Sequence, residues 1–143
     1  MQFVCDAPGG RTWFRIESEM EALQESLAMN HAVEKYFRRG QEKAALSYRP
    51  VSQNYIEQDI GRAAHISREM PLFLTLRDRE GAPLATAMLP PRAVAIPGFH
   101  IIIVGPSNCD PYGAHGDAIA ALGAHFNISL DRESCFPYNR TSP

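Results

Sequence analysis

Apolar and polar residues alternate after Pro71, and this is the clearest pattern in the chain. Leu72, Leu74 and Leu76 would share one face of a strand, because successive side chains of a strand point to opposite faces. A polar turn containing one glycine follows, and a second apolar run returns over 83–89. The two runs predict a β-hairpin.

A third strand is predicted over 99–104, where three isoleucines and a valine stand together. So short and β-branched a run is typical of a strand that is buried on both faces, and we therefore place it in the interior of a sheet. Together with the hairpin it predicts an antiparallel β-meander over 72–104.

The N-terminus predicts another hairpin. Two β-prone runs, 2–5 and 12–16, are separated by Pro8, Gly9 and Gly10, which suit a turn. The turn lacks the Gly-Lys-Ser/Thr ending of a phosphate-binding loop, so we assign it no ligand.

Between these hairpins the apolar spacing becomes helical. Ser18 and Glu21 form a capping box, in which the hydroxyl accepts a hydrogen bond from one amide of the first turn and the carboxylate reaches back to another. The apolar residues that follow make two stripes rotated relative to each other. Either the helix bends near Asn30 and His31, or both of its sides are covered, or Asn30 caps a second helix. Gly40 is expected to end the segment.

A further helix is predicted from Ser52 to about Ser67. Ile56, Ile60 and Ala63 recur there at helical spacing, and Ser52 is suited to cap the first turn. Short helices of this kind need an apolar partner surface, so we expect this helix to pack on the same face of the sheet as the first.

The end of the chain predicts weaker elements. A short C-terminal helix of small residues is expected from Asp117 to about Leu122, and the alternation over 126–130 indicates an edge strand. From about residue 131 the chain has two prolines and few apolar groups, so we expect an irregular tail that Phe136 and Tyr138 could dock.

These elements predict one α+β domain over residues 1–143. Its antiparallel-dominated sheet would consist of the N-terminal hairpin, the meander over 72–104 and the edge strand over 126–130, with two to three helices packed on one face. A chain of 143 residues is long enough for one well-buried core and too short for two ordinary domains.

Charge narrows the classes of partner. A formal net charge of −2 provides no general attraction to nucleic acid or to an anionic membrane, so neither partner is expected. Residues 81–130 contain only three charged side chains, Arg92, Asp110 and Asp117. So apolar a stretch predicts a homodimer that forms through the second half of the chain.

The chain shows no export signal and no long apolar span. Three cysteines without close pairing, Cys5, Cys109 and Cys135, fit reduced thiols, so a cytoplasmic location is expected. No spacing typical of metal ligands occurs, and neither a metal nor another cofactor is expected.

Reactive side chains concentrate in the loop after the predicted buried strand. The candidate ligand-binding residues are Ser107, Asn108, Cys109, Tyr112 and His115. This loop precedes a helix whose first amides are unpaired, and such amides favour a small anionic or carbonyl ligand.

The same loop contains the candidate catalytic residues. Cys109 could act as a nucleophile with His115 as its base, and Asp117 or Asp110 could orient the imidazole. Their spacing matches neither a nucleophile elbow nor a cysteine-hydrolase signature. Two hypotheses follow: a non-enzymatic binding or assembly domain, which we favour, and a small enzyme with a thiol and imidazole site in loop 107–117.

Overall fold

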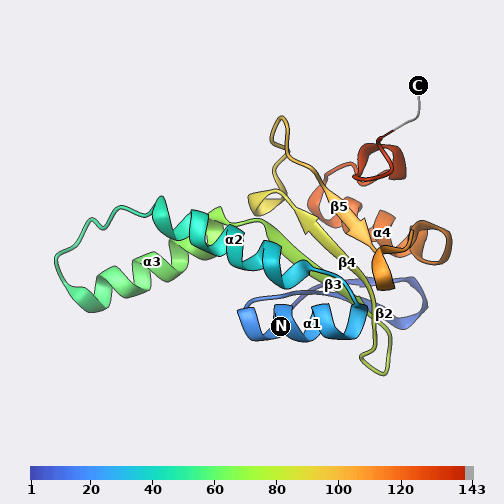
Figure 1. Ribbon diagram of the computed structural model, residues 1–143, viewed down its shortest axis with the longest axis horizontal. Coiled ribbons are helices and arrows are strands. Elements are labelled where there is room, and N and C mark those ends of the chain that lie inside the picture. Colours follow the sequence, from blue (N-terminus) through green and yellow to red (C-terminus); the bar gives the residue numbers. More distant parts are fainter. Residues whose placement is uncertain (141–143) are drawn as a thin grey trace.

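Five strands form one antiparallel sheet in which they lie in their order along the sequence, β1–β2–β3–β4–β5. The computed structural model describes residues 1–140 (Figure 1). The strands are β1 (Gln2–Ala7), β2 (Arg11–Arg15), β3 (Leu72–Arg77), β4 (Pro83–Leu89) and β5 (Ile102–Val104). The described α-helices are α1 (Glu19–Met29), α2 (Val33–Leu46), α3 (Tyr55–Glu69) and α4 (Tyr112–Phe126). The predicted α+β class with an antiparallel sheet is confirmed.

Both predicted hairpins are present. β1 pairs with β2 across a turn in which Gly9 and Gly10 have positive φ values, as the glycine-rich sequence requires. β3 pairs with β4 in a register that sets Leu74 opposite Ala87 and Thr75 opposite Thr86. The meander continues into β5, so its predicted order is also confirmed.

The position predicted for the third strand of the meander is wrong. We expected 99–104 in the interior, but the strand covers only Ile102–Val104 and lies at the edge of the sheet, whereas β3 is central. Its side chains are nevertheless largely covered on both faces. Ile103 packs into the core on one face, and on the outer edge a single parallel bridge joins Ile102 to Phe136 of the C-terminal segment.

The two faces of the sheet have separate cores. Trp13, Leu74, Ile103 and their neighbours pack against Ile119 and Leu122 of α4. On the opposite face, α1 and α2 supply apolar side chains that pack around the central strand; they are Ala22, Val33, Phe37 and Ala44, grouped with Ile16, Met70 and Phe73. Helices therefore cover both faces, with α1 and α2 on one. The helix predicted from Ser52 was expected beside the first helix on this face, whereas α3 packs mainly against α2 and has no buried residue.

The first helical segment divides at Asn30. Ser18 accepts a hydrogen bond from the Glu21 amide at 3.1 Å, and the Glu21 carboxylate accepts one from the Glu17 amide at 2.8 Å, so the predicted capping box is present. Asn30 adopts a left-handed conformation that ends α1, and α2 begins three residues later. The end predicted at Gly40 is wrong: α2 passes through this glycine, where an added Cβ would lie 3.0 Å from Pro71.

The other helix boundaries also differ from the prediction. Asn54, not Ser52, caps α3, since its side chain accepts hydrogen bonds from two amides of the first turn. α4 begins at Tyr112 rather than at 117 and continues to Phe126, so it is longer than predicted. The edge strand predicted over 126–130 is absent, because the left-handed Asn127 ends α4 and turns the chain away.

Residues 131–140 of the tail fold back over the edge strand and form no regular strand of their own. The Phe136 amide donates to the Ile101 oxygen at 2.8 Å, and the Tyr138 hydroxyl donates to the Ile103 oxygen at 3.3 Å. The predicted docking through Phe136 and Tyr138 is confirmed. In the described part of the chain, no helix combines the length and hydropathy needed to cross a membrane.

Exposed apolar side chains gather in the first half of the chain, not in the second. Most of the bulky ones belong to β1, α1 and the segment from Leu46 to Ile60, and among the described residues after β3 only Val94 and Ile96 are of this kind. The low charge of 81–130 is accounted for by the core, which buries most of the apolar residues of β4 and β5 and one face of α4. Self-association stays a prediction, but the second half no longer gives a reason for it.

Candidate functional site

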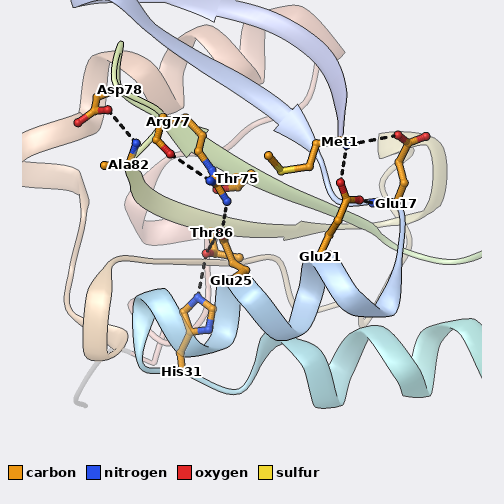
Figure 2. A network of polar contacts seen from close by, with 11 residues as sticks. Met1, Glu17, Glu21, Glu25, His31, Thr75, Arg77, Asp78, Ala82 and Thr86 are labelled. Carbon is orange, nitrogen blue, oxygen red and sulfur yellow. Dashed lines mark hydrogen bonds and ion pairs between the residues drawn. The ribbon is translucent and has the colours of Figure 1, made fainter.

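A chain of hydrogen bonds runs from α1 into the sheet beneath it. The Glu25 side chain is fully buried, and its carboxylate accepts from Arg77 Nη2 at 2.8 Å and from the Thr86 hydroxyl at 2.6 Å. His31 Nε2 lies 2.8 Å from the same Thr86 oxygen (Figure 2). These four residues come from α1, the α1–α2 linker, β3 and β4, so the network forms only in the folded chain.

Helical spacing explains why a carboxylate is buried here. Ala22, Glu25 and Met29 recur at intervals of three and four residues and form the buried face of α1. A buried charge is tolerated only when it is paired and hydrogen-bonded, and Arg77 and Thr86 meet that need. Arg77 reaches Glu25 from the end of β3.

The hydrogen-bond directions fix the state of the histidine ring. Because Thr86 donates its only hydroxyl proton to Glu25, His31 Nε2 must be the donor to Thr86. The Val33 amide donates to Nδ1 at 3.4 Å, so Nδ1 is an acceptor and carries no proton. Burial lowers the pKa of His31, although the Glu25 charge acts in the opposite direction. The ring is therefore neutral at pH 7.

A cavity of about 270 Å³ lies beside this network. Its walls are mostly apolar and come from the start of α2, from β4 and β5, and from the C-terminal segment; they include Val33, Met88, Ile102, Val104, Phe136 and Pro137. His31, Thr86 and Asn108 add polar atoms to the lining. A mostly apolar pocket with a few convergent polar groups is the usual form of a small-molecule site.

Two of the predicted ligand-binding residues belong to the surroundings of this cavity. Asn30 Nδ2 donates to Ser107 Oγ at 2.9 Å, which ties the end of α1 to the turn after β5. The next residue, Asn108, lines the cavity and has a positive φ of 60°. The contact between Asn30 and Ser107 thus helps to hold the Asn108 side chain at the cavity.

Cys109 takes another position. Its side chain is exposed, and its main-chain oxygen accepts from the Gly105 amide at 2.8 Å to close the turn. An added Cβ on Gly105 would lie 2.8 Å from the Cys109 sulfur, so the thiol rests against this glycine. Within residues 1–140, no hydrogen bond joins Cys109 to His115.

His115 and Asp117 instead share Arg11. Nη1 of Arg11 lies 2.9 Å from His115 Nδ1, and Nη2 lies 2.8 Å from each carboxylate oxygen of Asp117. Burial and the Arg11 charge lower the pKa of His115, while the hydrogen bond from Arg11 lowers that of Asp117. The contacts link the N-terminal hairpin to the start of α4, and this explains both side chains structurally.

Tyr112 packs against the segment that follows α4, away from the cavity. Its hydroxyl donates to the Leu130 oxygen at 2.9 Å, and burial raises its pKa. Its amide donates at 2.9 Å to Asp110, whose other carboxylate oxygen accepts from Arg132. A carboxylate of the chain itself therefore occupies the place where we expected an anionic ligand to meet the helix.

The structure thus divides the predicted site residues among four places. Sequence reasoning missed Glu25, His31 and Thr86, which lie far apart in the chain. One signal was available, because Glu25 stands at a core-facing position of an amphipathic helix and a charge there needs a partner. His31 and Thr86 gave no such signal.

The described residues 1–140 contain no cluster of three or more His, Cys, Asp and Glu side chains that could hold a metal ion. Comparisons of the chain with protein-family models, with curated proteins and with solved structures find no match.

Proposed function

We propose that this protein is a non-enzymatic binding domain that holds a small, mainly apolar molecule in the cavity beside His31 and Thr86. The observation that supports it is the contrast between apolar walls and a polar network whose groups already have partners. Thr86 and Glu25 are bonded to each other, and both ring nitrogens of His31 face a partner. Few polar atoms are left for a ligand, so most of its surface must be apolar.

One polar group of the lining suits a single polar atom of the ligand. The Asn108 side chain makes no hydrogen bond within the described residues, and an amide can both donate and accept. A carbonyl or hydroxyl group on the ligand would satisfy it. An anion fits less well, because the buried Glu25 carboxylate lies just behind His31 and Thr86.

NMR titration of the ¹⁵N-labelled protein tests this proposal with three probes: indole, cyclohexanone and hexanoate. We expect the two neutral probes to shift the amide signals of Thr86, Met88 and Asn108, and hexanoate to bind more weakly. Ala32→Phe should weaken binding at least about tenfold, because Ala32 is exposed at the cavity and a larger side chain can turn into it. Asn108→Gly removes the amide without straining the positive φ and should weaken cyclohexanone about tenfold.

The matched controls are Cys109→Ser and His115→Gln, which alter the loop but not the cavity. Both should bind the probes as tightly as the parent. The proposal is rejected if no probe binds the parent more tightly than Ala32→Phe. It is also rejected if the signals that shift belong to residues 109–117 and the control variants lose binding, a result that would favour the small enzyme with a thiol and imidazole site.

A further inference from the structure

Helices α2 and α3 form an arm that extends from the sheet (Figure 1). The two helices pack side by side, and α3 contains no buried residue. Bulky apolar side chains are exposed along the arm; they are Leu46, Val51, Tyr55, Ile56 and Ile60. So many exposed apolar groups on one small element indicate a surface that another molecule covers.

One side of α3 is already occupied by α2. An added Cβ on Gly61 would meet the Tyr48 hydroxyl oxygen at 2.6 Å, and His65 Nε2 lies 2.7 Å from Ser47 Oγ. The close approach at Gly61 fixes which side of α3 faces α2. At about 100° per residue, Ile60 then points away from α2.

The side of α3 that faces away from α2 carries an uncharged stripe. The C-terminal end of this stripe meets the body of the molecule, where Arg15 of β2 donates to the Ser67 oxygen at 2.6 Å. The members of the stripe recur at intervals of three and four residues: Ile56, Ile60, Ala63, Ala64 and Ser67. Ile56 is 72% exposed and Ile60 is 66% exposed, and the others are exposed as well. A helix with one side on α2 and a second, open apolar side has the pattern of a helix inside a larger bundle.

The charges beside this stripe decide which molecule fits. The acidic residues Glu57 and Asp59 lie in the N-terminal half of α3, and the basic residue Arg68 lies in its C-terminal half, on the same edge of the stripe as Glu57. An antiparallel α3 of identical sequence would bring Glu57 beside the second copy's Arg68 at both symmetric positions. A parallel one would bring like charges together.

We propose that two copies of this chain associate through antiparallel α3 helices. A two-fold axis between Gly61 and Arg62 sets Ile60 against Ala63 of the second copy, on both sides of the axis. The same register places Glu57 near the second copy's Arg68, on both sides of the axis. The interface is thus self-complementary in shape and in charge, as a two-fold dimer requires.

Light scattering coupled to size-exclusion chromatography at about 50 μM tests the assembly. We expect twice the chain mass of 15.9 kDa for the parent and the single-chain mass for Ile60→Arg, with an unchanged circular dichroism spectrum. Leu27→Arg is the matched control, because Leu27 is an exposed residue of the apolar side of α1 and should leave the dimer intact. A monomeric parent, a dimer that survives Ile60→Arg, or a dimer lost in Leu27→Arg would each overturn the proposal.

Charge reversal tests the antiparallel register. Glu57→Arg should weaken the dimer about tenfold at low salt, because it brings two arginines together at both symmetric positions. Adding Arg68→Glu in the same chain should restore the parent affinity. If the single reversal has no effect, or if the double reversal is weaker still, the two helices do not pair in this register.

Discussion

The indole Nε1 of Trp13 donates a hydrogen bond to the main-chain oxygen of Ala118 at 2.8 Å, across 105 residues of sequence. Trp13 is fully buried in β2, and Ala118 lies in the first half of α4. The bond joins the N-terminal hairpin to the helix that covers its face of the sheet. The Arg11 contacts with His115 and Asp117 reinforce the same junction from the surface.

Trp13→Phe should therefore lower the free energy of unfolding by about 2 kcal/mol, through the lost hydrogen bond and the smaller ring. Urea unfolding followed by circular dichroism measures this change. Phe3→Leu, at an exposed aromatic of the neighbouring strand, should change the free energy by less than about 0.5 kcal/mol. Equal effects of the two substitutions would contradict the role assigned to Trp13.

Removing either partner of the Glu25–Arg77 pair should lower the free energy of unfolding. Glu25→Ala leaves the mostly buried Arg77 without its carboxylate, and we expect a loss of about 3 kcal/mol. Arg77→Ala should cost about as much, because the fully buried Glu25 carboxylate would keep only the Thr86 hydroxyl. The double variant should lose clearly less than the sum, and strict additivity in a double-mutant cycle would show that the pair does not interact.

Stability should depend on pH through His31. Its pKa in the folded protein is lowered by burial, so the unfolded chain binds a proton first as the pH falls. The stability that the neutral His31 contributes is fully present above about pH 6.5, the ordinary pKa of histidine. This stability is lost as the pH falls from there through the lower pKa of His31 in the folded protein. The pKa of His115 is also lowered in the folded protein, so His115 makes stability fall with pH in the same direction.

His31→Gln keeps a donor for Thr86 but cannot titrate. Its free energy of unfolding, measured by urea between pH 7.5 and 5, should fall less steeply than that of the parent. A parent curve that is flat over this range would disprove the prediction.

Substitution by alanine should have opposite effects on stability at two glycines of α4. An added Cβ on Gly123 would lie 2.9 Å from the Ile128 main-chain oxygen, and backbone cannot move aside easily, so Gly123→Ala should destabilise by at least about 1 kcal/mol. Nothing lies within 4 Å of a Cβ on Gly116, so Gly116→Ala should stabilise by up to about 1 kcal/mol through helix propensity. Thermal unfolding of the two variants compares them directly, and shifts of the same sign would contradict this account.

The three thiols should react with iodoacetamide in the order of their exposure. Cys109 is exposed, Cys5 is half-buried and Cys135 is buried, and burial raises the pKa of the last two. Mass spectrometry of timed samples at pH 7 should find Cys109 labelled first, at the rate of an ordinary cysteine peptide. Labelling of Cys109 much faster than that peptide would favour a catalytic thiol.

The hairpins could be predicted from the sequence because their causes are local. Alternation, glycines with positive φ and turn residues stand next to one another in the chain, and the Ser18 capping box is equally local. The position of β5 could not be predicted, because periodicity describes which side chains are buried and says nothing about how many strands lie beyond. The C-terminal segment covers this edge, and its docking depends on contacts across some 35 residues.

Helix ends and the candidate site failed for a related reason. Gly40 has the residue type of a helix end, yet it serves close packing against Pro71 and Phe73. The loop 107–117 was correctly recognised as polar, but its side chains point to Asn30, Arg11, Leu130 and Arg132, none of which is near in sequence. Which partner a polar group finds is a property of the tertiary structure.

The order of the strands has a consequence for how the chain folds. Every sheet neighbour is also the next strand in sequence, so three of the four strand pairings can form by closing short connections, with little loss of chain entropy. The exception is the junction of β2 with β3, where residues 16–71 must be bridged. Closing this junction is the step with the largest entropic barrier. Folding should therefore begin independently in the meander and in the N-terminal hairpin. The pairing of β2 with β3, which joins the two, should be the rate-limiting step.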